Sequence, residues 1–197
     1  MNTLLHKNWY KYLAIALIGY SLVGGLLFNV PRVNILNETI RNLYFHVPMW
    51  FGMTFLLLMS LVYSVRFLRT NNSLFDLAAE KSAEVALWFG FFGLLTGSMW
   101  ARYTWGAWWV NDPKLNAAAI GVLIYLAYFI LRGSVNDEDK KGRIAAVYNV
   151  FVFFLFVTLI YVIPRLTDSL HPGNGGNPAM SLYDNSSMDA NMRIVFY

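Results

Sequence analysis

Long apolar runs alternate with short polar segments along this chain. A helix needs about 20 apolar residues to cross the hydrocarbon core of a bilayer, and five of the runs are close to that length or longer. We therefore predict an all-α, polytopic membrane helix bundle that forms a single integral membrane domain over residues 1–197. The predicted spans are approximately residues 10–28, 43–67, 84–103, 113–131 and 144–163.

The two ends of the chain need separate interpretation. The first apolar run is longer than the ~7–15 residues of a signal-peptide core and no A-x-A site follows it, so we expect it to be retained as a span. Residues 192–197 turn apolar after the Gly- and Pro-rich segment 171–178, which predicts the start of a sixth span. Either the rest of that helix is missing or the tail lies on the membrane surface, and we favour the first.

The composition strengthens the membrane prediction. The chain is 57% hydrophobic and 13% charged, with a mean hydropathy of +0.45, whereas soluble domains carry roughly 25% charged residues. The net charge of +4 comes mainly from basic residues beside the apolar runs, so it indicates contact with membrane lipid and no nucleic-acid partner. There are no cysteines, which excludes disulfides, iron–sulfur clusters, thiolate nucleophiles and haem held through thioethers.

The distribution of basic residues predicts the orientation. If the N-terminus is cytoplasmic, nine Lys and Arg residues lie in the inner segments and six in the outer segments, which is a positive-inside bias. The loop at 104–112 and the tail at 164–197 then lie outside, in the periplasm of a Gram-negative cell. The segment 132–143 becomes a cytoplasmic turn, which we expect to be solvated and without a functional role.

The most unusual stretch is residues 105–112, WGAWWVND, between the third and fourth spans. It places three tryptophans within five residues. Indole rings suit a membrane–water interface, and they also lie well against a planar ligand. Asp112 followed by Pro113 is a strong start signal for the fourth span, a role that accounts for the carboxylate without any ligand.

Two histidines are predicted at the same face of the membrane. His46 lies at the outer end of the second span, and His171 lies just beyond the outer end of the fifth. Taken singly, each is an interfacial histidine with one hydrogen bond. Taken together, on separate helices and on either side of the Trp-rich segment, they are typical of the two axial imidazoles of a haem iron. Zinc and di-iron sites need more protein ligands than the sequence offers.

A haem at this level would bring further requirements. Its propionates favour nearby cations, and Arg41, Arg102 and Lys114 at the outer ends of spans are candidates, although anchoring at the interface is the commoner role of such residues. An imidazole must be neutral to bind iron. We therefore expect ligation by His46 and His171 to weaken below about pH 6.

Residues 105–112 resemble the W-G-x-x-W-x-W-D signature of the tryptophan-rich haem-handling membrane proteins of cytochrome c maturation. Residues 97–100 (GSMW) and 44–48 (YFHVP) are also similar to that family. The order and length of the elements most resemble the haem exporter protein C family, the short C component of the system I pathway, over nearly the whole chain. Asn111 stands where the signature has its last tryptophan.

The resemblance implies a six-helix bundle with an external haem site. His46 and His171 match the family's two external axial ligands, which would hold haem b transiently and without a covalent bond. The implied platform beneath the haem is formed by Trp105, Gly106, Trp108, Trp109 and Asp112.

The resemblance also implies a role and a set of partners. The protein would present haem at the periplasmic face of the inner membrane to a periplasmic haem chaperone, the E component. A single-span D component and an ATPase complex of A and B components would complete the assembly. No catalytic residue is implied, so we expect a delivery scaffold and not an enzyme.

Three other functions are alternatives to haem delivery. A haem lyase, as in larger relatives of the family, has more spans and a second, intramembrane histidine pair, which is not found here. A haem transporter would need a polar path, and no charged residue falls convincingly in the middle of a predicted span. A b-type electron carrier would need histidines inside the spans, whereas His46 and His171 are predicted at the membrane edge.

Overall fold

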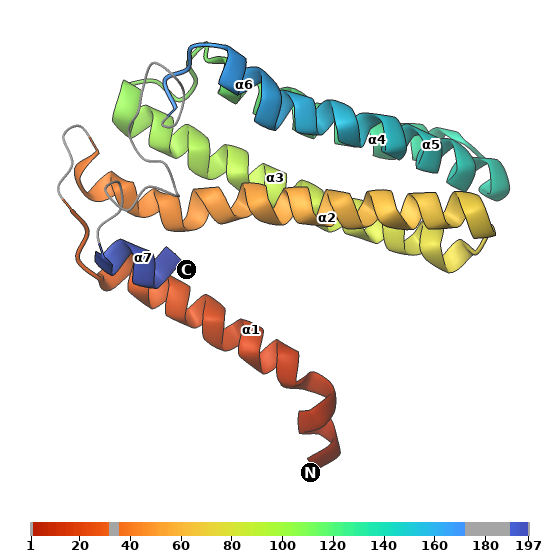
Figure 1. Ribbon diagram of the computed structural model, residues 1–197, viewed down its shortest axis with the longest axis horizontal. Coiled ribbons are helices and arrows are strands. Elements are labelled where there is room, and N and C mark those ends of the chain that lie inside the picture. The colour runs from red at the N-terminus through yellow and green to blue at the C-terminus, as the bar shows by residue number, and fades with distance from the viewer. Residues whose placement is uncertain (1, 32–35, 172–189, 197) are drawn as a thin grey trace.

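A computed structural model describes residues 2–31, 36–171 and 190–196, and all regular structure in these ranges is helical (Figure 1). Five helical segments are long and apolar enough to cross a membrane, which confirms the predicted all-α polytopic fold. The elements are α1 Asn2–Leu27, the 3-10 helix η1 Asn37–Asn42, α2 Leu43–Thr70, α3 Ser73–Trp105, α4 Pro113–Ser134, α5 Glu138–Val157, the π-helical turn η2 Thr158–Val162, α6 Ile163–Leu166 and α7 Ala190–Phe196.

The helices α2, α3, α4 and α5 form the body of the molecule. α2 runs antiparallel to α3, and the pair of α4 and α5 lies beside them, while α1 diverges from this body (Figure 1). We call the end at which α2 and α4 begin and α3 finishes the outer end, and the opposite end the inner end. α7 lies at the outer end, beside α1.

The third predicted span is part of a longer helix. α3 begins at Ser73, whereas the apolar pattern placed its start near residue 84. Asn72 caps the helix, because its side chain accepts a hydrogen bond from the backbone N–H of Leu74 at 3.0 Å. Hydropathy marks only the part of a helix that lies in hydrocarbon. The first turns of α3 carry charged side chains, so the helix extends beyond the predicted span at the inner end.

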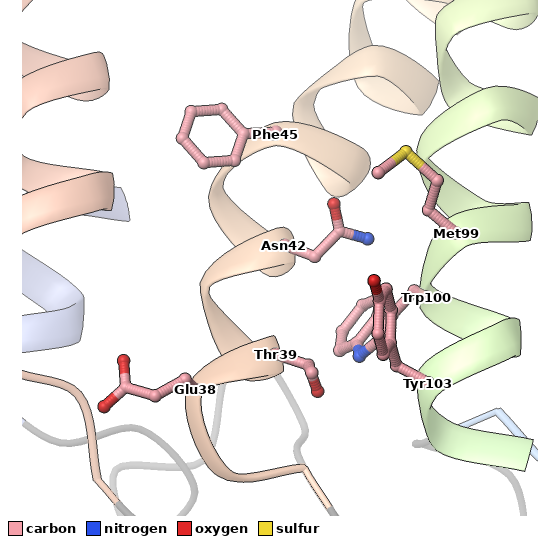
Figure 2. Close-up of a pocket in the computed structure, with 7 residues that line it drawn as sticks. All are labelled: Glu38, Thr39, Asn42, Phe45, Met99, Trp100 and Tyr103. Carbon is pink, nitrogen blue, oxygen red and sulfur yellow. The ribbon is translucent and has the colours of Figure 1, made fainter.

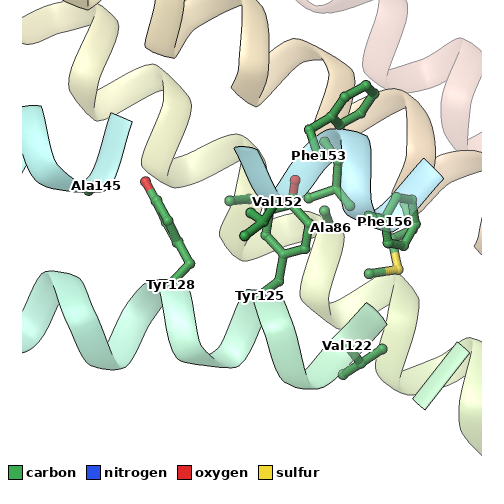
Figure 3. Close-up of a cluster of buried hydrophobic side chains, with 11 residues drawn as sticks. Ala86, Val122, Tyr125, Tyr128, Ala145, Val152, Phe153 and Phe156 are labelled. Atoms are coloured by element: carbon green, nitrogen blue, oxygen red, sulfur yellow. The ribbon is translucent and has the colours of Figure 1, made fainter. Parts of the chain in front are cut away.

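Buried side chains from all four body helices meet in one cluster (Figure 3). Aromatic rings from α4 and α5 fill most of it, and small residues of α3 allow the helices to approach closely. Tyr125 and Phe156, for example, lie edge to face with ring centroids 6.0 Å apart. The cluster contains Met53, Leu57, Ala83, Ala86, Val122, Tyr125, Tyr128, Ala145, Val152, Phe153 and Phe156.

The inner end contains a buried ion pair between α3 and α4. Arg132 is 8% exposed and donates to both carboxylate oxygens of Asp76, at 2.8 and 2.5 Å. Glu80 lies 3.1 Å from the same guanidinium. The expectation of a solvated turn over 132–143 is therefore wrong at Arg132, because its charge is buried against carboxylates of the neighbouring helix.

The last described residues form α7, which packs on α1. Tyr20 donates its hydroxyl proton to the carbonyl of Ile194 at 2.8 Å. The side chain of Val195 lies against Gly24: a Cβ added to this glycine would be 3.0 Å from Cγ2 of Val195. The segment predicted to start a sixth span is therefore helical, while the Gly- and Pro-rich residues 172–178 lie outside the described residues.

Candidate functional site

The candidate site lies at the outer end of the bundle, where several segments meet. His46 lies near the start of α2, residues 106–112 join α3 to α4, and His171 follows α6. The two imidazoles are close enough to interact electrostatically. The fold therefore brings together the two histidines that the sequence singled out.

The side chain of His46 is held by a hydroxyl of α3. Its Nδ1 lies 3.2 Å from the Oγ1 atom of Thr96. Thr96 donates its own proton to the carbonyl of Phe92 at 2.7 Å, so the hydroxyl oxygen is left to accept from His46. The proton of the neutral imidazole is thus on Nδ1, and the lone pair of Nε2 remains available to a metal.

A stripe of glycines on α3 makes room for the side chains of α2. A Cβ added to Gly97 would lie 2.8 Å from Cε1 of His46, and one added to Gly93 would lie 3.0 Å from Trp50. Gly90 shows the same close approach one turn further along. Small residues at this helical spacing are typical of a close helix contact, and here the stripe also seats the imidazole.

Two tryptophans outside the Trp-rich segment flank His46. The rings of Trp50 and Trp100 lie edge-on to the imidazole, with centroids 6.3 and 6.0 Å away. The sequence analysis placed neither ring beside His46. The spacing of His46 and Trp50, four residues apart on one helix, is a signal for the first contact. The contact of Trp100 depends on how α2 and α3 pack.

Asp112 connects the start of α4 to His171. Its carboxylate accepts from the backbone N–H of Lys114 at 2.9 Å, as the predicted helix cap, and lies 3.3 Å from Nδ1 of His171. The same carboxylate accepts from the hydroxyl of Ser169 at 2.9 Å and from the backbone N–H of Leu170 at 2.7 Å. Capping is therefore only one of its roles, and Ser169 is a site residue that the sequence analysis missed.

The charge states of this pair follow from their surroundings. Burial disfavours the charged form of Asp112, but hydrogen bonds from Leu170 and Ser169 oppose it and hold the pKa of the carboxyl below its usual value. Burial and the nearby charge of Lys114 lower the pKa of His171 to about 4. At neutral pH a carboxylate therefore faces a neutral imidazole, whose Nδ1–H points to Asp112 and whose Nε2 carries the lone pair.

The Trp-rich segment begins where α3 ends. Gly106 has a φ of 80°, the left-handed conformation that ends many helices and that glycine adopts without strain. Arg102 donates to the carbonyl of Gly106 and so closes the last turn. Trp105 packs edge-on against His171 with ring centroids 5.2 Å apart, whereas Trp108 is 60% exposed.

The third tryptophan of the segment is connected to α4. The indole N–H of Trp109 donates to the side-chain oxygen of Asn116 at 3.2 Å. The side-chain amide of Asn116 donates in turn to Asn111 at 2.8 Å. Asn111, the departure from the family signature, therefore makes a defined contact within the segment.

The three candidate cations have different surroundings. Lys114 interacts electrostatically with both imidazoles. Arg41 pairs with Glu38 at 2.7 Å and donates to backbone carbonyls at the end of α1, and Arg102 is bound to the carbonyl of Gly106. Of the three, the structure brings Lys114 to the histidines and uses the other two at helix ends.

A shallow, mostly apolar pocket of about 220 Å³ lies between η1 and the last turns of α3 (Figure 2). Met99, Trp100 and Tyr103 of α3 line one side, and Phe45 of α2 lines another. The indole N–H of Trp100 is buried without a hydrogen-bond partner among the described residues. Because Trp100 also contacts His46, the pocket adjoins the surroundings of that imidazole.

The donor set fits a haem better than a metal ion held by protein ligands alone. No group of three or more His, Cys, Asp or Glu residues that could hold a metal occurs within the described ranges. Two neutral imidazoles with available Nε2 atoms match the two axial positions of a haem iron. The surrounding indoles supply the broad aromatic surface that a porphyrin requires.

Comparison with known proteins places this geometry in context. A family model described as heme exporter protein C matches residues 3–197. The chain is 36% identical to the heme exporter protein C of Bradyrhizobium diazoefficiens over 55% of this chain and 41% of the relative. It is 29% identical to that of Paracoccus denitrificans over 77% of this chain and 62% of the relative, and 26% identical to that of Escherichia coli K12 over 85% and 69%. The chain thus spans less than two thirds of the length of the first two.

Proposed function

Because this chain belongs to the haem exporter protein C family, we propose that it binds haem at the periplasmic face of a bacterial inner membrane and delivers it to a periplasmic haem chaperone. Handling of haem for c-type cytochrome biogenesis is the role of the family. The observation that carries the proposal is the pair of imidazoles at one end of the bundle, each with Nδ1 hydrogen-bonded inside the protein.

His46 and His171 are the proposed axial ligands. Each imidazole offers the Nε2 lone pair, and each is held by a partner from another element: Thr96 for His46 and Asp112 for His171. Partners of this kind orient metal-binding histidines and keep the required tautomer. The bound group is haem b, held transiently and without a covalent bond, since the chain has no cysteine to form a thioether.

The Trp-rich segment is the proposed platform for the porphyrin. Trp105 stands against His171, and the exposed ring surfaces of Trp108 and Trp109 are free for a planar ligand or a partner. Gly106 and Asp112 set the two ends of the segment, through the helix end and the helix cap. Lys114 is the proposed main partner of the propionates, with Arg41 and Arg102 as additional cations.

The proposed role is that of a delivery scaffold and not of a catalyst. The groups at the site orient imidazoles and offer aromatic surface. The hydroxyl of Thr96 donates its proton to a backbone carbonyl, and the carboxylate of Asp112 accepts hydrogen bonds from Ser169 and Leu170. The proposed partners are the haem chaperone (E component), the single-span D component and the ATPase/permease A and B components. With the N-terminus in the cytoplasm, the outer end faces the periplasm, where the chaperone is located.

Haem binding by the purified full chain tests the proposal. We expect the wild-type protein to show a haem Soret band, and His46→Ala and His171→Ala each to change the band. Added imidazole should restore part of the original spectrum in each variant, since it supplies the missing ligand. His6→Ala is the matched control, because His6 belongs to the basic N-terminal flank on the predicted opposite side of the membrane. Unchanged spectra in both site variants would refute the axial assignment.

Delivery is tested separately by co-purification with the haem chaperone. Trp108→Ala should reduce capture of the chaperone and leave the fold intact, because Trp108 is 60% exposed. If the wild-type chain captures neither haem nor chaperone, the proposed function is wrong.

A further inference from the structure

A chain of three polar side chains connects the Trp-rich segment to the first turn of α4. It runs from the indole of Trp109 through the amide of Asn116 to Asn111, with distances of 3.2 and 2.8 Å. The direction of every hydrogen bond in it is determined. An indole N–H can only donate, so Asn116 must turn its oxygen to Trp109 and its NH₂ group to Asn111. Asn111 must then present its own oxygen.

The middle residue of this chain sits on a rigid support. Asn116 is the first residue of α4 whose backbone N–H has a helical acceptor, the carbonyl of Asp112, at 3.0 Å. Asp112 caps the same turn and also holds the segment that carries His171. One turn of α4 therefore supports two parts of the site: Asp112 supports the imidazole of His171, and Asn116 supports the ring of Trp109.

Asn111 is the acceptor that ends the chain. The family signature has a tryptophan at this place, and an indole has no acceptor atom for the NH₂ group of Asn116. In this protein the amide at 111 leaves neither end of Asn116 unpaired. The substitution exchanges an aromatic ring for a hydrogen bond that fixes the neighbouring ring.

We infer that Asn116 is a positioning residue for Trp109, with Asn111 as the acceptor that fixes the amide of Asn116 in the required orientation. The indole is anchored by its N–H edge, and the residue remains 43% exposed. Its contribution to ligand binding is that of an apolar ring held in one orientation. That part of the inference rests on the proposed haem site.

The hydrogen bond itself is tested in the haem-free full chain by ultraviolet resonance Raman spectroscopy, which reports the hydrogen bonding of indole N–H groups. The difference between wild type and Trp109→Phe isolates the signal of Trp109. Asn116→Leu should shift this signal to that of a free indole. Asn116→Asp should keep it, because the carboxylate accepts from Trp109 and Asn111 can turn its own NH₂ group toward the carboxylate. Asn111→Ala should give an intermediate shift.

Hemin titration tests the consequence for binding. Asn116→Leu should weaken binding about 3- to 10-fold, the effect of one lost hydrogen bond, and Asn116→Asp should restore it to within about twofold. In the Trp109→Phe background, Asn116→Leu should have less than about a twofold effect, because the two residues act through one contact.

Two results would overturn the inference. One is an unchanged Trp109 signal in Asn116→Leu, and the other is an equal loss of hemin affinity from Asn116→Leu in the wild type and in the Trp109→Phe background. If Asn116→Leu does not fold, the comparison of Asn111→Ala with Asn111→Asp decides, since only the second keeps an acceptor for Asn116. If the wild type binds no hemin, the proposed function fails, while the Raman measurement still decides whether the hydrogen-bonded chain exists.

Discussion

The carboxylate of Asp112 lies 3.3 Å from Nδ1 of His171, although the two residues are 59 positions apart in the chain. The same carboxylate caps α4. A single buried side chain therefore determines both where a membrane helix starts and how a candidate iron ligand is oriented. These two roles can be separated by substitution.

Asp112→Asn should keep the helix cap and weaken the site. Asparagine caps helices about as well as aspartate, but it lacks the charge that holds the Nδ1 proton of His171. Loss of such a partner typically lowers metal affinity by about 10- to 100-fold. Hemin titration should show this loss. The thermal unfolding midpoint should also fall somewhat, because the NH₂ group of asparagine cannot accept from the backbone N–H of Leu170. Asp112→Ala should additionally destabilise the protein by about 1 kcal/mol through loss of the cap. Equal hemin affinity in wild type and Asp112→Asn would refute the orienting role.

Gly97→Ala should disturb His46. The added methyl would lie 2.8 Å from Cε1 of the imidazole. Accommodating such overpacking lowers the free energy of unfolding by about 1–3 kcal/mol. We expect an altered Soret band and weaker hemin binding. Gly133→Ala is the matched control, because this helical glycine has no atom within 4 Å of the added Cβ. The control should be neutral or slightly stabilising, and equal effects of the two substitutions would contradict the prediction.

Acid should affect His171 at a lower pH than an ordinary histidine. Its pKa is lowered from 6.5 to about 4, so between these values the unfolded chain binds a proton that the folded chain does not. The contribution of His171 to the free energy of unfolding should therefore fall as the pH drops from about 6.5 to about 4. Below about pH 4 this contribution should change no further. Ligation by this imidazole should persist at pH 5, below the limit of about pH 6 expected from an exposed histidine.

A pH titration of the Soret band checks this prediction. Lys114→Met is the informative variant, because removal of this charge should raise the pKa of His171 and move the loss of ligation to higher pH. A midpoint for the loss of ligation near pH 6.5 in the wild type would contradict the lowered pKa of His171. An unchanged midpoint in Lys114→Met would contradict the role of Lys114 in lowering it.

Arg132→Met should destabilise the bundle without changing the haem spectrum. The substitution leaves Asp76 and Glu80 without the guanidinium that pairs with both carboxylates. Removing one partner of a buried ion pair costs about 3–5 kcal/mol, which denaturation in mixed micelles would measure. Arg132→Lys should recover part of the lost stability, since lysine keeps the charge but cannot form the bidentate hydrogen bonds to Asp76. A change of less than about 0.5 kcal/mol in Arg132→Met would show that the pair is not stabilising.

Much of the fold and the identities of the two histidines could be predicted from the sequence. A span must be apolar over about 20 residues, because a bilayer core offers no partner for polar groups. That local requirement is visible residue by residue, and it yielded all five spans. It also placed His46 and His171 at the same face, and the Asp-Pro start of α4 followed from local capping rules.

The contacts that build the site were decided by the tertiary structure. The pairing of Asp112 with His171, the edge-on contact of Trp100 with His46 and the burial of Arg132 join residues from different helices or segments. The periodicity of apolar residues in the sequence does not indicate such contacts. They depend on which faces of the helices meet and on the space that small residues leave there. The sequence by itself thus determined the spans and the chemical groups at the outer end, and helix packing decided how those groups are oriented.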